Sequence, residues 1–462
     1  MTAVSLLDDE AAIIEVNPII LFKNAADFVN IEVRIGGFKN LSQNQVHIKA
    51  SDRAIVIGVG LKAEPLSEIK ENLLELEELV VAAGGEIVGS LIQTLPAWNP
   101  ATLIGTGKVE EIREMVQEAR ATLVVVDHQL SGVQGRNLAQ AMGARVIDRN
   151  QLILDIFALR AQTFEGKLQV ELAQLLDQMP RMVGAWMDSL SRQGGGIGTR
   201  GPGETALEND RRRIRERAAI IRKKLDSVSK NRAQHRSSRR RQEIPSFALI
   251  GYTNSGKSSL LNRLTGSQIM TKNQVFATLD PTTRKIFLPE GPPAVVTDTV
   301  GFMRKLPTQL IEAFKATLEE SAEADVLLHV VDLSSPNMHR QIEVVEDLIK
   351  EFNWQDKKII HVFNKVDVAP VERQFKVRQY PRIFVSALTG QGTEQLKKLM
   401  VESVQEMQTE VQLYFPRAEE FKIYDLDRET RIARKETASE GTVCYTQLTP
   451  ALITRWKNYI VK

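Results

Sequence analysis

A glycine-rich stretch that directly follows an apolar run constrains this chain more than any other feature. The apolar run is Phe247–Ile250, and the stretch after it is Gly251-Tyr252-Thr253-Asn254-Ser255-Gly256-Lys257-Ser258. This spacing of Gly, Lys and Ser predicts a loop whose backbone amides face phosphate groups, followed by a helix whose positive end faces the same anion. We expect Lys257 to reach the β- and γ-phosphates and the Ser258 hydroxyl to bind Mg²⁺.

Two later segments predict which nucleotide is bound. Asn364-Lys365-Val366-Asp367 follows an apolar run, and so does Ser386-Ala387-Leu388. Both should lie at the carboxyl ends of parallel strands, where doubly wound sheets bind ligands. The Asp367 carboxylate only accepts hydrogen bonds, and guanine offers two adjacent N–H donors where adenine does not. With Lys365 along the base and an amide of Ser386-Ala387 at the guanine oxygen, the pattern predicts GTP rather than ATP.

The γ-phosphate and Mg²⁺ should be sensed by two further segments. Asp298-Thr299-Val300-Gly301 would bring a carboxylate to the metal, through water, and the Gly301 amide to the γ-phosphate. In the segment Phe276–Arg284, Thr278 and Thr282 both qualify as the threonine that senses the metal, and Thr278 is preferred. The predicted catalytic residues are Lys257, Thr278 and Gly301, and the predicted metal ligands are Ser258, Thr278 and Asp298. The predicted nucleotide contacts are Gly251, Tyr252, Thr253, Asn254, Ser255, Gly256, Lys257, Ser258, Ser259, Phe276, Ala277, Thr278, Asp298, Thr299, Val300, Gly301, Asn364, Lys365, Asp367, Ser386, Ala387 and Leu388.

Phe302 stands next to Gly301, where many GTPases carry a glutamine that orients the attacking water. A phenylalanine cannot orient water, although it can pack beneath the switch segment. We therefore expect slow hydrolysis by the isolated chain and full catalysis only with a partner or another residue that positions water.

The cysteine and histidine content, the lengths of the apolar runs and the N-terminal segment exclude several other classes of protein. Cys444 is the only cysteine, which excludes an intramolecular disulfide, and the six histidines lack the Cys/His spacing of a zinc site. No apolar run approaches the roughly 18 residues that span a bilayer. The N-terminus lacks the basic flank of a secretion signal. We expect a cytoplasmic, monomeric protein without a membrane span.

The 462 residues predict a multidomain α/β protein. The centre should be a P-loop GTPase domain with a doubly wound, mostly parallel sheet, because apolar strand-like runs alternate with helix signals there. The expected regions are an N-terminal extension over 1–66 (β-rich or α/β), an α/β domain over 67–162, a long antiparallel helical hairpin over 163–243, the GTPase domain over 244–403, and a small α+β C-terminal domain over 404–462. In the last region, the segments that resemble strands are Val411–Phe415, Phe421–Asp425 and Thr442–Tyr445, and Thr449–Tyr459 resembles a short helix.

The expected hairpin has a glycine-rich tip and a basic second helix. Pro180 should kink or locally break the first helix. Six glycines in the eleven residues Gly194–Glu204 suggest a backbone brought close to a ligand rather than a plain turn. Arg211–Arg241 contains fourteen Lys or Arg against two acids, a density that favours binding to the phosphates of RNA or DNA. The predicted nucleic-acid contacts are Arg192, Gly195, Gly196, Gly198, Arg200, Arg211, Arg212, Arg213 and Arg215.

Several segments resemble the HflX family of translational GTPases. They are Asp155–Arg160, Glu165–Leu175, Gly195–Gly198, Arg200–Thr205, Phe276–Thr282 and Asp298–Phe302, and the match runs from roughly Ser67 to Ser403. The resemblance implies binding to the large ribosomal subunit and its rRNA, with the hairpin tip near the peptidyl transferase centre. It also implies dissociation of stalled or idle ribosomes and GTP hydrolysis stimulated by the ribosome. Members of the family usually have no proline in the first hairpin helix, so Pro180 departs from the family pattern.

Two alternative functions stay open at this point. One is a GTPase that assembles or checks the large subunit without splitting joined ribosomes. The other is a regulator outside the ribosome that uses its α/β domain to hold a protein partner.

Ile104-Gly105-Thr106-Gly107-Lys108 resembles a second phosphate loop, but only one residue separates its glycines and Val109 replaces Ser or Thr. It therefore predicts a turn before a helix, without a nucleotide.

Overall fold

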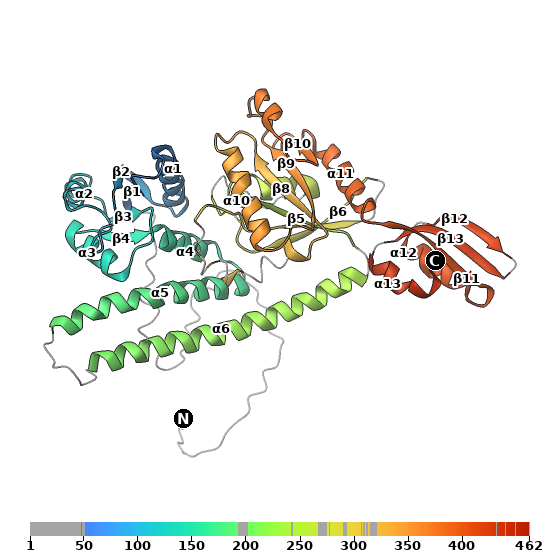
Figure 1. The fold of residues 1–462 in the computed structure, drawn as a ribbon, viewed down its shortest axis with the longest axis horizontal. Coiled ribbons are helices and arrows are strands. Elements are labelled where there is room, and N and C mark those ends of the chain that lie inside the picture. Colours follow the sequence, from blue (N-terminus) through green and yellow to red (C-terminus); the bar gives the residue numbers. More distant parts are fainter. Residues whose placement is uncertain are drawn as a thin grey trace, which may run out of the picture. The chain divides into compact units, whose positions relative to one another are not determined.

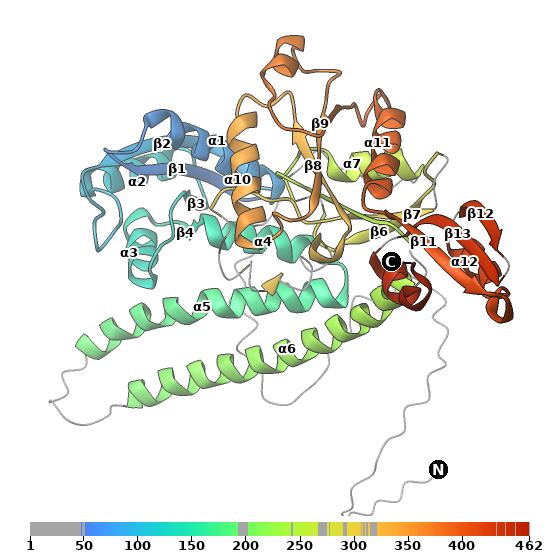
Figure 2. The same ribbon diagram turned by 45° about the vertical axis from the view of Figure 1, so that its right-hand side comes forward.

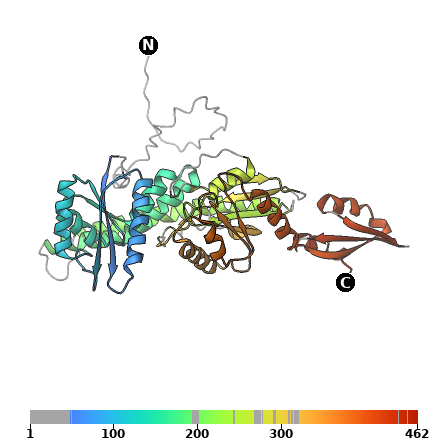
Figure 3. The same ribbon diagram turned by 90° about the horizontal axis from the view of Figure 1, so that it is seen from above.

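The computed structural model describes residue 48 and residues 51–192, 202–241, 244–266, 275–289 except 277, 293–305, 307, 310, 313, 314, and 321–461 except 431, 439 and 449. Short aliphatic runs form its first sheet. The sheet is parallel, with strand order β2-β1-β3-β4. Its inner strands β1 and β3 are almost entirely buried, as expected for a parallel sheet with helices on both faces (Figure 3). The elements are β1 Arg53–Leu61, α1 Leu66–Ala82, β2 Glu86–Leu95, α2 Thr106–Glu118, β3 Leu123–Val126, α3 Gly132–Met142, β4 Arg145–Asp148 and α4 Arg149–Arg160.

The domain boundary expected after residue 66 is wrong. β1 lies between β2 and β3 and is an inner strand of the α/β domain rather than part of an N-terminal extension. The strand is buried because α1 packs on it, and Gly58 and Gly60 allow Ile69 of that helix to approach the backbone closely. The segment Ile104–Lys108 leads into α2, which begins at Thr106.

The hairpin consists of α5 Phe164–Arg192 and α6 Pro202–Arg241, which lie side by side (Figures 1 and 2). Leu168 and Leu172 of α5 and Ile214 and Ile221 of α6 are buried at this seam. The helix α5 continues through Pro180, so the expected local break is absent. Of the glycine-rich tip, residues 202–204 begin α6, whereas residues 194–201, with the predicted contacts Gly195, Gly196, Gly198 and Arg200, lie outside the described residues.

The central domain contains a six-stranded sheet in the order β10-β9-β8-β5-β7-β6, in which only the edge strand β6 is antiparallel to its neighbour. Buried residues of α7 and α11 pack against one face of the sheet, and those of α10 against the other. The elements are β5 Ser246–Gly251, α7 Lys257–Thr265, β6 Thr282–Ile286, β7 Ala294–Asp298, β8 Val326–Asp332, α10 Met338–Glu351, β9 Lys358–Asn364, the 3-10 helix η2 Val371–Lys376, β10 Arg382–Phe384 and α11 Thr393–Gln405.

The C-terminal domain is a three-stranded antiparallel sheet in the order β11-β13-β12 with short helices. The segment Phe421–Asp425 is helical, not a strand, because Ile423 and Leu426 face the core at helical spacing while exposed polar residues surround them. The strand β12 was not expected. The elements are β11 Thr409–Pro416, η3 Arg417–Glu419, α12 Lys422–Glu429, β12 Ile432–Ala438, β13 Gly441–Leu448, α13 Pro450–Arg455 and η4 Lys457–Tyr459.

No helix in the described part of the chain is both long enough and apolar enough to cross a bilayer.

Candidate nucleotide-binding site

The glycine-rich loop joins β5 to α7 in a conformation that requires its glycines. Gly251 and Gly256 have φ angles of +149° and +91°. A Cβ atom added to Gly251 would lie 2.2 Å from the carbonyl oxygen of Val330, and one added to Gly256 would lie 2.3 Å from Nδ2 of Asn364. The loop therefore packs against β8 and β9 at distances that exclude any side chain, and α7 begins immediately after it at Lys257.

Lys257 is buried inside this loop. Its Nζ donates hydrogen bonds to the carbonyl oxygens of Gly251 at 3.1 Å and Tyr252 at 2.8 Å. Burial lowers the pKa of the Lys257 ammonium to about 8, although the nearby Asp298 carboxylate opposes this shift. Because two carbonyl dipoles only partly replace water around a cation, a phosphate group would be a favourable partner for this ammonium.

Three side-chain oxygens converge at the amino end of α7. The Ser258 hydroxyl lies 2.5 Å from Oδ2 of Asp298 and 2.6 Å from the hydroxyl of Thr278. Oδ1 of Asp298 is buried without a hydrogen-bond partner among the described residues, and burial raises the pKa of this carboxyl. Hydroxyl and carboxylate oxygens are the ligands that Mg²⁺ takes from proteins, and the bare Oδ1 fits such a cation or its water. Of the two candidate threonines, Thr278 is thus at this cluster, whereas Thr282 begins β6.

The side chain of Asn364 joins the phosphate loop to the loop after β10. Its Nδ2 donates to the Ser255 carbonyl at 2.9 Å, and its Oδ1 accepts from the Ala387 amide at 2.9 Å. The Ser386 amide donates to the Gln391 carbonyl. Both amides that were expected at the guanine oxygen are therefore engaged within the protein, and Asn364 ties the two loops together rather than pointing freely at a base.

Lys365 and Asp367 stand at the carboxyl end of β9. Nζ of Lys365 lies 2.7 Å from Oδ2 of Asp332, which holds the lysine stem beside the pocket. Asp367 is exposed and lines the same pocket. This carboxylate is therefore available to a ligand.

A pocket of about 540 Å³ collects most of the predicted residues. Its lining comprises Thr253, Asn254, Gly256, Lys257, Ser258, Ser259, Phe276, Thr278, Thr299, Gly301, Ser334, Asn364, Lys365, Asp367, Val368, Ala387 and Leu388. The predicted contacts that do not line it are Gly251, Tyr252, Ser255, Asp298, Val300 and Ser386, and Ala277 lies outside the described residues. Ser334 and Val368 line it without having been predicted. Ser334 follows the end of β8, and that position next to the other loops was its only signal.

Phe302 points away from the pocket. Its backbone pairs with the phosphate loop, because the Phe302 amide donates to the Gly251 carbonyl at 3.0 Å and its carbonyl accepts from the Thr253 amide at 2.7 Å. The ring is 3% exposed and packs with Ile250 and Leu327 in the core. This side chain thus supports the segment after Gly301 and cannot reach a water in the pocket.

The phosphate loop also contacts the N-terminal domain. The Tyr252 hydroxyl donates to the Glu75 carboxylate of α1 and accepts from the Arg304 amide at 3.0 Å. Arg304, two residues after Phe302, pairs with Glu68 of the same helix. Figure 2 shows α1 beside α10, and Arg340 of α10 pairs with Glu68 at 2.8 Å. Acidic side chains of α1 thus hold both the phosphate loop and the segment after Gly301.

A buried ion pair lies behind this contact. Arg149, 2% exposed, donates from Nη1 to Asp127 Oδ1 at 2.8 Å, and its Nη2 pairs with Glu75 and lies 3.3 Å from the Arg304 carbonyl. Lys305 Nζ reaches the other Asp127 oxygen at 2.8 Å. One guanidinium therefore joins the N-terminal domain to the segment that follows Gly301.

The predicted nucleic-acid contacts on α6 are exposed. The side chains of Arg212, Arg213 and Arg215 are 68%, 59% and 57% exposed. Their acidic partners in the same helix lie 3.5 to 3.7 Å away and have side chains that are 38% to 66% exposed, so these pairs are weak and easily exchanged. Arg211 is partly buried, and the side chain of Arg192 lies outside the described residues.

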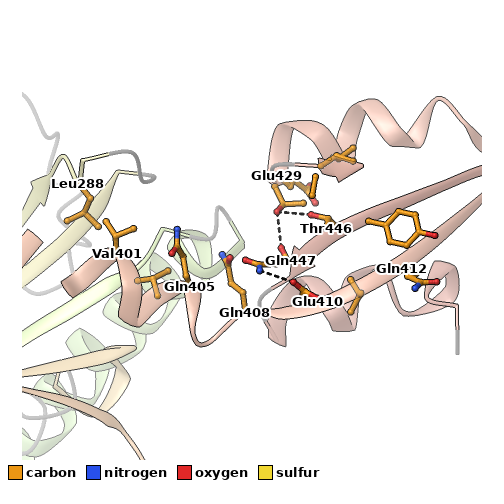
Figure 4. A pocket seen from close by; sticks show the side chains of 15 residues that line it. Leu288, Val401, Gln405, Gln408, Glu410, Gln412, Glu429, Thr446 and Gln447 are labelled. Carbon is orange, nitrogen blue, oxygen red and sulfur yellow. Dashed lines mark hydrogen bonds between the residues drawn. The ribbon is translucent and has the colours of Figure 1, made fainter. Parts of the chain in front are cut away.

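A second cavity, of about 980 Å³, lies between α11 and the C-terminal sheet (Figure 4). Its lining is mostly uncharged, and Gln447 there bonds to Glu410 while Thr430 donates to the Gln447 carbonyl. Among the described residues of the lining, the charged ones are Glu410 and Glu429. Carboxylates repel phosphate, so the described part of the lining offers a nucleotide no favourable charge.

Comparisons with known proteins found matches along most of the chain. Three family models match consecutive parts of the chain: "GTP-binding GTPase N-terminal" over residues 70–158, "GTP-binding GTPase Middle Region" over 160–239, and "50S ribosome-binding GTPase" over 246–365. The GTPase HflX of Caldanaerobacter subterraneus subsp. tengcongensis is 42% identical over 412 residues, 89% of this chain and 95% of the relative. The GTPase HflX of Escherichia coli is 45% identical over 336 residues, 72% of this chain and 79% of the relative.

Among solved structures, the complex of SsGBP with GDP is similar with a TM-score of 0.43 and 25% identity, covering 76% of this chain and 99% of that one. A GTP-binding protein from Sulfolobus solfataricus in complex with GDP has a TM-score of 0.40 and 24% identity, covering 77% and 99%.

Proposed function

Because the chain belongs to the HflX family of GTPases, we propose that it binds the large ribosomal subunit and uses GTP to dissociate stalled or idle ribosomes. The chain binds and hydrolyses GTP as a GTPase of this family. The proposal extends this activity to a substrate, the joined ribosome. The observation that carries the extension is the exposed basic face of α6. This helix precedes a nucleotide domain whose own side chain after Gly301 cannot activate water.

In the proposed mechanism, the phosphate loop binds GTP through its amides and Lys257 neutralises the β- and γ-phosphates. A bound Mg²⁺ would supply positive charge that offsets the negative charge developing on the phosphate oxygens. Ser258 and Thr278 would hold it with their hydroxyls, and Asp298 through its buried Oδ1. The Gly301 amide would then contact the γ-phosphate, since this glycine lies against Lys257.

The choice of guanine would depend on Asp367. Its carboxylate accepts hydrogen bonds from the two adjacent N–H groups of guanine, and Lys365, held by Asp332, lies along the base. Adenine lacks that pair of donors and would leave the carboxylate unpaired.

Ribosome binding would occur through the exposed arginines of α6, which can exchange their weak intrahelical partners for rRNA phosphates. The buried Phe302 predicts that the isolated chain hydrolyses GTP slowly and that the ribosome supplies or orders the missing catalytic group.

Sedimentation of purified ribosomes tests this proposal. With GTP or a non-hydrolysable analogue the chain should convert joined ribosomes into free subunits, and with GDP it should not. A variant with Arg212, Arg213 and Arg215 changed to Gln should lose splitting and show a shallower dependence of binding on salt. The matched control changes three exposed cations outside the hairpin, Arg113, Arg120 and Lys398, to Gln and should behave like the unchanged protein. Cosedimentation with large subunits while joined ribosomes stay intact would instead support an assembly or quality-control role.

A further inference from the structure

The switch segment that carries Thr278 is attached to the base of the hairpin through Asp280. Oδ2 of Asp280 accepts hydrogen bonds from the backbone amides of Gln162 and Thr163, both at 3.0 Å, and its Oδ1 accepts from the Thr163 hydroxyl. These residues immediately precede α5. Amides at the start of a helix have no partner within the helix, and a carboxylate there is also favoured by the helix dipole.

Gly166, in the first turn of α5, is explained by the same contact. A Cβ atom added to it would lie 2.3 Å from Oδ1 of Asp280. Glycine inside a helix is less stable than alanine there, and a plain helix start would not need it. Its amide instead donates to the Thr163 hydroxyl at 2.9 Å. The first turn of α5 is thus shaped to receive the carboxylate of a residue more than a hundred positions away.

A second anchor lies on the other side of Thr278. The Phe276 ring, 2% exposed, packs edge-on against Phe157 of α4, with 4.6 Å between ring centroids. Phe157 in turn packs against Phe314, with 5.2 Å between centroids. The segment is therefore held two residues before Thr278 by an aromatic contact and two residues after it by Asp280. Between these anchors, the Thr278 hydroxyl meets Ser258 at 2.6 Å.

We propose that Asp280 is a positioning residue for the GTPase reaction: by binding the start of α5 it holds Thr278 at the metal-binding oxygens, and it thereby couples the nucleotide to the hairpin. This inference rests on the proposed metal role of Thr278. Because coupling is reciprocal, a nucleotide that orders the switch segment also stabilises the start of α5, and a partner that orders α5 favours the ordered switch. GTP has the γ-phosphate that this segment senses and GDP lacks it, so the contact distinguishes the two nucleotides.

The test compares the affinities of a fluorescent non-hydrolysable GTP analogue and of fluorescent GDP for the full chain with Mg²⁺, without ribosomes. Asp280→Ala should weaken the analogue about tenfold, the scale of a lost charge-assisted hydrogen bond, and leave GDP within about twofold. Asp280→Asn, which keeps an acceptor oxygen without the charge, should lie between. Gly166→Ala leaves Asp280 unchanged but places a methyl group where the Asp280 carboxylate lies, so it should reproduce the selective loss of affinity for the GTP analogue.

Hydrogen exchange separates positioning from a purely structural cap. In the unchanged chain, the amides of residues 162–168 should exchange more slowly with the GTP analogue than with GDP, and in Asp280→Ala this difference should vanish. Equal weakening of both nucleotides, or none, would overturn the inference. Thr278→Ala is the reference variant. If it lowers analogue affinity and Asp280→Ala does not, the positioning role of Asp280 is refuted while the role of Thr278 stands. If Thr278→Ala has no effect, the proposed metal role itself fails.

Discussion

Replacing Asp127 by alanine should expose how strongly the N-terminal domain depends on one buried pair. Asp127 is 1% exposed and Arg149 is 2% exposed, with 2.8 Å between Oδ1 and Nη1. Removing the carboxylate leaves the guanidinium buried with fewer partners. It also removes the 2.8 Å contact to Lys305, whose side chain is 44% exposed and therefore adds little.

The size of the loss follows from what Arg149 retains. Breaking a buried ion pair by removing one partner typically costs about 3–5 kcal/mol, because a charge is left uncompensated. Arg149 still has Glu75, which is 15% exposed, and the Arg304 carbonyl at 3.3 Å. We therefore expect the lower end, about 3 kcal/mol. Asp127→Asn keeps two polar atoms of the same shape and should cost less.

Native-state hydrogen exchange in increasing urea measures this free energy at the amides of β3, Leu123–Val126. The control removes both charges: Asp127→Leu with Arg149→Met should recover more than half of the loss, since no unpaired charge stays buried beyond the partly exposed Glu75. A loss below about 1 kcal/mol for Asp127→Ala, within the range of an ordinary neutral hydrogen bond, would refute the view that Asp127 compensates a buried charge.

Three further outcomes are expected. The pKa of Lys257, about 8, lies below its ordinary 10.5, so the unfolded chain binds more protons than the folded chain between those pH values. The free energy of unfolding without nucleotide, measured by urea titration, should therefore rise from pH 8 to 10. The rise should be smaller in Lys257→Met. Gly256→Ala should abolish tight binding of GTP and GDP alike in calorimetry. Gly266→Ala is the control: Gly266 has a positive φ of 66°, but an added Cβ would meet nothing within 4 Å among the described residues, so both affinities should stay nearly intact. Phe302→Gln should not create a fast GTPase in a phosphate-release assay, because the side chain faces the core, and it should destabilise the fold by about 2–4 kcal/mol.

The nucleotide pocket could be predicted from sequence because its local geometry depends on residue types that few alternatives can replace. Gly251 and Gly256 adopt positive φ angles that residues with side chains disfavour, so these glycines mark where the loop turns. Lys257 follows Gly256 directly and begins α7, so its position is set by the same loop. Ala387 lines the pocket and Ser386 does not, and the amides of both bond within the protein, which no motif reveals.

Contacts between distant segments left no signal of that kind. Asp280 lies in a recognised switch segment, yet its partners Gln162 and Thr163 precede it by more than a hundred residues. Glu68 and Glu75 lie on a helix with many acidic residues, a pattern typical of a solvated face, and only the fold brings Arg304 and Arg149 to them. Such pairings depend on how domains pack, which residue spacing along the chain does not encode.

The continuity of α5 through Pro180 follows from the fold in the same way. Proline removes one backbone hydrogen bond and crowds the preceding turn, but the next residue, Arg181, is held from three directions. It pairs with Asp177 in the preceding turn and with the buried Asp148, both at 2.8 Å, and donates to the Leu130 carbonyl at 3.2 Å. The ion pair to Asp177 spans the proline and ties the turns on either side of it together. Asp148 directly precedes Arg149, so two consecutive residues of the N-terminal domain contact the hairpin, through Arg181, and the nucleotide domain, through the Arg304 carbonyl. Along α5, Arg181 lies about 27 Å from the end that Asp280 contacts.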